Sequence, residues 1–325
     1  MQHRPRLGAI LALAGAALIV ASLVYLLGQA AAWDAPTYLA AGERLNAGHA
    51  LYALGPGDRP VLLNPPYWTV PLLSPPPIAV LWRPIALLGW NGMVLWWAVC
   101  VSAISGVIVA LAVRAPSLTG PALLVLSIPI AWEIGSANVN GLLIAGTVVT
   151  WLLARRGHDR AAGALVAGMT ALKVWPAFLM LWFAVQRRWG AVGGFLVAGV
   201  AIAVGSVLGA GLNAHLEYLS IARAIYPSEL SIAGLLAGIG ISVPWIGYVL
   251  AFLCALAIVR WRARPSETFG LAVATIVLAS PVLYINGYAL LIAALAPFAW
   301  PLASTRTPAT EVVPTQPGEL VQIAE

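Results

Sequence analysis

Long stretches without a charged residue set the strongest limit on how this chain can fold. Stretches that lack Asp, Glu, Lys and Arg recur from one end of the sequence to the other, and each exceeds the roughly 17 residues that a transmembrane helix needs. Their hydrophobic residues are continuous and do not alternate with a period of two, so the sequence predicts helices and not a barrel. The stretches span residues 7–33, 84–113, 115–132, 134–154, 189–216, 230–259 and 268–305.

The composition supplies too few charged residues to coat a water-soluble fold. Hydrophobic residues make up 61% of the 325-residue chain and charged residues only 9%, whereas a soluble domain carries about 25% charged residues. The mean hydropathy is +0.92. The sequence therefore predicts an all-α, polytopic protein embedded in a lipid bilayer.

The net charge of +6 does not indicate nucleic acid as a partner. In a polytopic membrane protein an excess of Arg marks the cytoplasmic ends of helices. Cys100 and Cys254 both lie inside apolar stretches, which argues against a disulfide and against a thiolate metal site. The four histidines have no short spacing, so we expect neither a bound metal nor another cofactor.

The first apolar stretch and the polar segment after it set the start of the topology. His3, Arg4 and Arg6 precede a span over 7–32, which is far longer than the roughly 7–15 apolar residues of a cleaved signal peptide. The span is predicted to remain in the protein and to begin in the cytoplasm. Residues 33–83 form the longest polar segment and are predicted to face outward.

Two parts of this outward segment differ in pattern. Residues 37–47 are typical of a short amphipathic helix with Tyr38, Ala41 and Leu45 on one side. The proline-rich part that follows is predicted to be an ordered loop in the membrane interface, because its prolines exclude a regular helix or a central strand. The aromatic residues of this loop are Tyr67, Trp68 and Trp82.

The segment over 161–186 decides the topology of the rest of the chain. It carries one charge, Lys173, followed by Pro176. If the chain reverses at Lys173 as a short hairpin, 12 of the 17 basic residues lie in the cytoplasm, whereas a single crossing leaves only seven there. The hairpin is therefore predicted. Its arms reach only about 18–20 Å, so the Lys173 tip stops short of the outer surface.

The remaining sequence brings the number of spanning or re-entrant helices to about ten. Residues 230–241 are glycine-rich and predicted to be re-entrant or interfacial, after a second outward loop that holds His215, Glu217, Arg223 and Glu229. The other expected spans cover about 91–113, 119–133, 139–154, 190–211, 243–259, 268–281 and 284–302.

A single membrane-embedded domain is expected over residues 1–302. The tail over 303–325 is rich in Pro, Thr and Glu and is predicted to be disordered. The topology places both termini in the cytoplasm and the protein in the plasma membrane.

Asp34 is the first acidic residue of the chain and directly follows the first apolar stretch. A carboxylate there lies beside the low-dielectric interior yet remains within reach of a polar substrate. This position suits a general base. The alternative is that Asp34 only caps the helix that begins near Thr37.

Lys173 is the single lysine of the chain, and the predicted hairpin places it at membrane depth. A charge there costs at least about 2.5–3.5 kcal/mol and by default marks a functional site. A compact ammonium group suits a lipid phosphate. The alternative is a structural ion pair with Glu133 or Asp34. Glu133 itself ends a span, either as that partner or as a group that binds a sugar hydroxyl.

Neutral polar residues gather at the outward turns. Asn138 and Asn140 either contact the substrate or are ordinary turn residues. Asn286 lies between Tyr284 and Tyr288, whose alternative role is in the aromatic belt of the membrane interface.

Several short motifs carry a resemblance through their order and spacing. They are Asp34, Tyr38 and Ala41 with Gly48 and Tyr52; Ser74-Pro75-Pro76-Pro77 with Arg83-Pro84; Gly135 with Asn138; Ala162-Gly163 with Lys173, Pro176 and Arg187-Arg188-Trp189; and Ser231, Gly234-Leu235-Leu236 and Ser280-Pro281. Over about residues 5–300 the chain resembles glycosyltransferase family 87, membrane enzymes of the C-type fold that depend on a polyprenyl-phosphate sugar. It departs from the family pattern in three ways. The usual Gln of the turn is Ser136, the usual His pair after Ser-Pro is replaced by Asn286 and Tyr288, and the chain is shorter.

The resemblance implies an alpha-mannosyltransferase-like enzyme that moves a sugar, first of all mannose, from a polyprenyl-phosphate donor to a cell-envelope glycan or glycolipid, with inversion. Asp34 would be the general base, and Lys173 would lie near the departing phosphate. The active site would face outward. The implied substrate-binding residues are Tyr38, Arg44, Glu133, Asn138, Lys173, His215, Asn286 and Tyr288. Two other classes stay open: a polyprenyl-lipid flippase or transporter, and an inactive relative that scaffolds envelope assembly.

Overall fold

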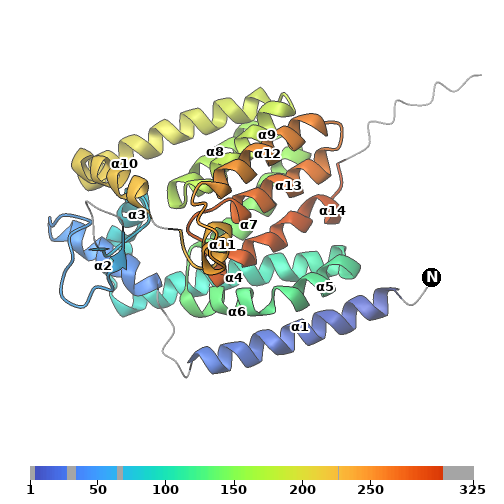
Figure 1. Cartoon of the computed structure of the whole chain (residues 1–325), viewed down its shortest axis with the longest axis horizontal. Coiled ribbons are helices and arrows are strands. Elements are labelled where there is room, and N and C mark those ends of the chain that lie inside the picture. Colours follow the sequence, from blue (N-terminus) through green and yellow to red (C-terminus); the bar gives the residue numbers. More distant parts are fainter. Residues whose placement is uncertain (1–3, 28–33, 64–68, 226, 303–325) are drawn as a thin grey trace, which may run out of the picture.

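The computed structural model describes residues 4–27, 34–63, 69–225 and 227–302, and helices dominate it (Figure 1). Within these residues the strands are β1 (Val61–Leu62) and β2 (Thr69–Val70), which form one short antiparallel pair. The predicted all-α, polytopic membrane architecture is confirmed. The 303–325 tail, Tyr67 and Trp68 lie outside the described residues.

Three of the described helices are long and apolar enough to cross a membrane: α1 (Arg4–Leu27), α4 (Trp90–Arg114) and α10 (Trp189–Ala224). A fourth span results if α5 (Pro116–Val125) and α6 (Ser127–Ser136) count as one, although they bend by 70° where they meet. Five shorter apolar elements lie among these in the described part of the chain. The shorter elements are α7 (Asn140–Arg155), η1 (Trp175–Phe178) with α9 (Leu179–Val185), α12 (Ile246–Arg260), α13 (Pro265–Leu278), and η2 (Ile285–Leu295) with α14 (Ala296–Ala299).

The predicted reversal at Lys173 is confirmed. Helix α8 (Asp159–Leu172) ends at Lys173, whose backbone is extended with φ −145° and ψ 134°. The chain then returns through η1 and α9. At the far end, Arg188 donates a hydrogen bond of 2.8 Å to the carboxylate of Asp159, so both ends of the segment lie together. Lys173 is therefore the tip of a hairpin.

The outward segment differs in part from the prediction. The expected amphipathic helix is α2 (Asp34–Asn46), which begins three residues early and buries Tyr38 and Ala41. The expectation of a loop through residue 83 is wrong for its last part, because α3 (Pro76–Ala86) is a helix. Prolines are tolerated in the first turn of a helix, where their missing N–H groups would have no partner. Trp82 is fully buried against Tyr38 and Trp96, so it is not an interface residue.

The second outward loop is also shorter than predicted. Helix α10 continues to Ala224 across a kink at Gly211, where φ is 80° and ψ is 155°. His215, Glu217 and Arg223 therefore lie on a helix. Only the remainder of that loop leads to α11 (Ile232–Gly238), the glycine-rich element before α12. The predicted span ends at residue 211, whereas α10 continues beyond it, because a glycine at positive φ lets a helix bend and resume.

Two hydrophobic cores organise these elements. One lies in the helix bundle around Trp151, Trp182 and Phe269, and the other lies under the outward segment around Tyr38 and Trp82. In Figure 1, α2 and α3 lie at the left end of the molecule, and α5 and α14 lie toward the right. The candidate functional site lies where the two cores meet.

Candidate functional site

A cavity of about 510 Å³ separates the outward segment from the helix bundle. Its walls come from both cores, with Tyr38 and Leu72 on one side and Leu143 and Ile276 on the other. The volume falls within the range of roughly 300–1,000 Å³ typical of small-molecule sites. The polar residues of the wall include Asp34, Tyr38, Arg59, Ser136, Asn138, Asn140, Lys173, Tyr218, Tyr284 and Asn286.

Asp34 is the first residue of α2 and lines the cavity. The side-chain amide of Asn138 donates a 2.9 Å hydrogen bond to its Oδ2. Burial raises the pKa of Asp34 above its ordinary value, while the Asn138 hydrogen bond and the charge of Lys173 act in the opposite direction. A carboxyl group with a raised pKa is a stronger base once ionised, which suits removal of a hydroxyl proton near neutral pH.

The turn between α6 and α7 fixes Asn138. Ala137 adopts a left-handed conformation with φ 52° and ends α6. The Asn138 Oδ1 then accepts a 3.2 Å hydrogen bond from the backbone N–H of Asn140, the usual way an asparagine closes a turn on its own backbone. Its Nδ2 is left to point at Asp34. One side chain thus closes the turn and also holds Asp34 at the cavity wall.

Lys173 enters the same cavity from the hairpin tip. Its Nζ donates a 2.7 Å hydrogen bond to Oδ1 of Asn140. Nδ2 of Asn140 donates in turn to Oε2 of Glu133 at 2.9 Å, and the backbone N–H of Gly141 donates to Oε1 of Glu133 at 2.8 Å. Lys173 and Glu133 therefore interact through Asn140 and form no direct ion pair.

Glu133 is buried and does not line the cavity. Its neighbours Asn138 and Asn140 do line the cavity, so the wall offers these two amides where Glu133 was expected to bind a sugar hydroxyl. Asn286 does line the cavity, and its Nδ2 lies 3.4 Å from Oγ of Ser136, the residue that stands where a glutamine was expected. The two departures at Ser136 and Asn286 therefore contact each other across the site.

A family model supplies the class of enzyme. The model of glycosyltransferase family 87 matches residues 73–281, which is more than half of the chain. The chain belongs to glycosyltransferase family 87. It is thus a membrane glycosyltransferase, and Asn138, Asn140 and Lys173 lie inside the matched range, whereas Asp34 and Asn286 lie outside it. Comparisons with curated proteins and with solved structures gave no match.

Three further residues predicted to bind substrate lie outside the cavity wall of this family 87 enzyme. Arg44 pairs with the carboxylate of Asp58 at 2.6 Å and donates to the Leu51 carbonyl, which ties the outward loop to α2. His215 lies across the α10 kink, 2.9 Å from the Gly211 carbonyl oxygen and 2.9 Å from Oγ of Ser206. The Tyr288 hydroxyl donates to the Leu230 carbonyl at 2.8 Å.

Several polar residues of the wall were not predicted as site residues. Among them, Ser136, Arg59 and Tyr218 line the cavity, together with Asn140, which was predicted either to contact the substrate or to be an ordinary turn residue. Asn140 carried a signal in the sequence, because it shares the outward turn with Asn138. Arg59 and Tyr218 carried none, since the loop and α10 reach the site only through packing. Within the described residues, no three His, Cys, Asp or Glu side chains group closely enough to hold a metal ion.

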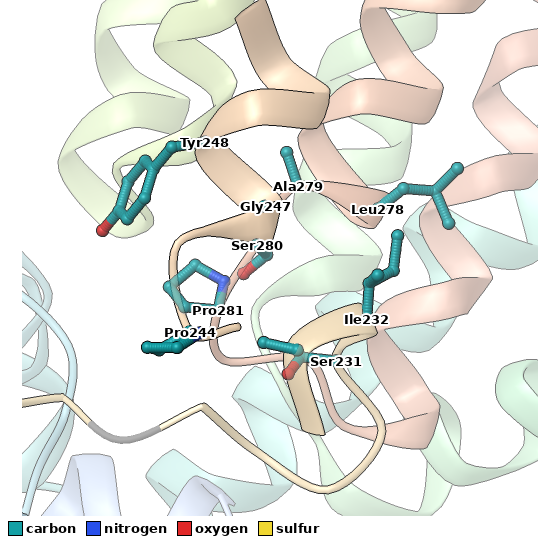
Figure 2. A pocket seen from close by; sticks show the side chains of 10 residues that line it. Ser231, Ile232, Pro244, Gly247, Tyr248, Leu278, Ala279, Ser280 and Pro281 are labelled. Atoms are coloured by element: carbon teal, nitrogen blue, oxygen red, sulfur yellow. The ribbon is translucent and has the colours of Figure 1, made fainter. Parts of the chain in front are cut away.

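The last two family motifs meet beside the cavity. Figure 2 shows Ser231, Pro244 and Gly247 gathered around Ser280 and Pro281. Ser228 holds residues 281–283 through several hydrogen bonds. Its backbone N–H donates to the Pro281 carbonyl at 2.9 Å, its hydroxyl donates to the Leu283 carbonyl at 2.8 Å, and the Leu283 backbone N–H donates to Oγ of Ser228 at 2.8 Å.

Gly247 allows the close approach, because a Cβ there would lie 2.5 Å from the Ala279 carbonyl oxygen. These contacts hold residues 280–287, which form one wall of the cavity.

Proposed function

We propose that this enzyme transfers a sugar from a polyprenyl-phosphate donor to an acceptor hydroxyl, with inversion, inside the 510 Å³ cavity. One observation carries the proposal. A carboxylate, Asp34, and an ammonium group, Lys173, line the same cavity from opposite chain segments. This is the pair of charges that the reaction requires.

The chemistry follows from these two groups. The acceptor oxygen attacks the anomeric carbon and loses its proton to Asp34. The bond between that carbon and the phosphate oxygen breaks, and the polyprenyl phosphate leaves with the electron pair. Lys173 balances the phosphate charge, so the leaving group needs no proton from a general acid.

The apolar part of the cavity wall supports a lipid-linked donor. Leu72, Val174, Trp175 and Leu230 line it together with the polar groups. A prenyl chain would lie against such a surface while its phosphate remained near Lys173. We propose polyprenyl-phospho-mannose as the donor, a cell-envelope glycan or glycolipid as the acceptor, and the outer face of the plasma membrane as the place of reaction.

Replacement of Asp34 tests the proposal. In purified enzyme in nanodiscs, Asp34→Asn should lower transfer from polyprenyl-phospho-mannose or -arabinose by about 100- to 10,000-fold, the usual contribution of a general base. Glu43→Gln on the same helix α2 is the matched control, because Glu43 is exposed and outside the cavity wall. Near-normal transfer by Asp34→Asn would overturn the assignment.

The same variants separate the two other classes. Lipid flux across the membrane of sealed proteoliposomes that depends on Asp34 but yields no glycan product would indicate a flippase or transporter. Donor binding without turnover in the wild type would indicate an inactive scaffold, which the replaced His pair motivates.

A further inference from the structure

We propose that Glu133 is a positioning residue for the donor phosphate, which it orients from outside the cavity by fixing the side-chain amide of Asn140. This inference rests on the proposed function, because it assigns the phosphate to Lys173. Its parts are three side chains in one line: Glu133, Asn140 and Lys173.

The chemistry of the groups determines the direction of the Asn140 amide. A carboxylate only accepts hydrogen bonds and an ammonium group only donates them. An amide between the two must therefore present Nδ2 to Glu133 and Oδ1 to Lys173. The observed contacts have this arrangement, at 2.9 Å and 2.7 Å.

Both carboxylate oxygens of Glu133 accept hydrogen bonds, so its side chain is itself fixed in place. Its second oxygen accepts a 2.8 Å hydrogen bond from the backbone N–H of Gly141, in the first turn of α7. Only 2% of Glu133 is exposed, and it does not line the cavity, so no substrate atom reaches it. A buried carboxylate that binds no substrate and pairs with no cation directly is costly. Its orienting role explains why this position carries an acid.

The consequence for Lys173 is a fixed ammonium direction. One N–H group of Lys173 is committed to Asn140 Oδ1. The other two are then restricted to directions set by that bond, on the side of the cavity that Lys173 lines. When the ammonium group is already oriented, the Lys173 side chain loses less conformational entropy as the phosphate binds.

Glu133→Gln reverses this arrangement without a change in side-chain size. The carbonyl oxygen of the introduced glutamine would accept from the Gly141 N–H, which leaves the NH₂ group of that glutamine facing Asn140. The Asn140 amide must then turn its oxygen toward the glutamine and its NH₂ group toward Lys173. Two donors would face each other there, and the ammonium group would lose its partner.

A second substitution should restore the pattern. In Glu133→Gln with Asn140→Asp, the NH₂ group of the introduced glutamine donates to one oxygen of the introduced aspartate, and Lys173 donates to the other oxygen. Every hydrogen bond of the line regains one donor and one acceptor. The total charge of the cluster is also the same as in the wild type.

The experiment measures binding of polyprenyl phosphate to the full chain in nanodiscs, together with KM and kcat for donor turnover. Glu133→Gln should weaken phosphate binding and raise KM by about 10- to 100-fold, as expected when a hydrogen bond to a charged group is lost. The double variant should recover at least half of the loss on a logarithmic scale. Glu43→Gln is the matched control on an exposed acid.

Two results would overturn the inference: unchanged phosphate affinity in Glu133→Gln, or a double variant that binds no better than the single one while both remain folded. Thermal unfolding of each variant reports whether it is folded. Failure of the proposed function would appear differently, as wild-type enzyme that binds polyprenyl phosphate normally but transfers no sugar.

Discussion

At the scale of single residues, the two asparagines of one turn each hold a different charged side chain of the cavity wall. Asn138 uses its oxygen to close the turn and its NH₂ group to hold Asp34. Asn140 uses its oxygen to hold Lys173 and its NH₂ group to reach Glu133. Each amide thus links the fold to one of the two charged groups to which we assign the transfer. An asparagine can do this because it is donor and acceptor at once.

The pH dependence of transfer should report on Asn138. Because burial raises the pKa of Asp34, its base form should be lost on acidification at a higher pH than for an ordinary aspartate. Asn138→Ala removes a hydrogen bond that lowers this pKa, so the acidic limb of the kcat/KM profile should move to still higher pH. The maximal rate should fall by about tenfold or more.

The control for this prediction is Asn213→Ala, an exposed asparagine of α10. Its profile should match that of the wild type. An acidic limb that stays in place in Asn138→Ala would show that Asp34 does not set it.

At the scale of elements, close backbone contact between α8 and α10 holds the Lys173 hairpin in place. A Cβ at Gly163 would overlap the Ala191 carbonyl oxygen, and one at Gly194 would overlap the Arg160 carbonyl oxygen. Glycine at these two positions brings the helices together as small residues do at membrane helix interfaces. The hairpin could be predicted from the distribution of charge, but this contact could not, since many glycines in the chain face open space.

A pair of glycine substitutions on α8 tests the packing. Gly163→Ala should destabilise the enzyme by about 1–3 kcal/mol, as overpacking does, and lower its thermal unfolding temperature. Gly168→Ala, on the same helix, meets no atom within 4 Å of its Cβ and should be neutral or stabilising by up to about 1 kcal/mol. Equal unfolding temperatures for the two variants would contradict the close contact.

At the scale of the whole molecule, the pattern of charged and apolar residues predicted the architecture better than the positions of proline and glycine did. The membrane class, the amphipathic helix at Asp34 and the hairpin at Lys173 followed from the spacing of charged and apolar residues. Helix α3 and the continuation of α10 did not, because proline at a helix start and glycine at a kink leave the same sequence signal as a loop.

The cavity was predictable only in part for a related reason. Asp34, Asn138, Lys173 and Asn286 line it as expected, and each follows or interrupts an apolar stretch. Arg44 and His215 are charged or titratable and lie in the outward part of the sequence, yet they bond to the Leu51 and Gly211 carbonyls instead. Sequence pattern gives the depth of a residue in the membrane, whereas the direction of its side chain depends on tertiary packing.

Orientation in the membrane provides the last prediction. The outward segment with α2 and α3 lies at the opposite end of the molecule from α5 and α14 in Figure 1, and we expect the end with α5 and α14 to face the cytoplasm. The basis is the excess of Arg near residues 155–160, 187–188 and 260–264, because Arg-rich loops favour the cytoplasmic side of a membrane. Asp34 and the cavity would then open outward, where a lipid-linked sugar and an envelope acceptor can meet.

Labelling of intact cells checks this orientation. In a background with Cys100→Ala and Cys254→Ala, a membrane-impermeant maleimide should modify His49→Cys, next to α2, but not His158→Cys, between α7 and α8, until the cells are opened. Both positions are exposed, so access to the reagent depends on the side of the membrane and not on burial. The reverse pattern would place the Asp34 cavity in the cytoplasm and require a donor and an acceptor on that side.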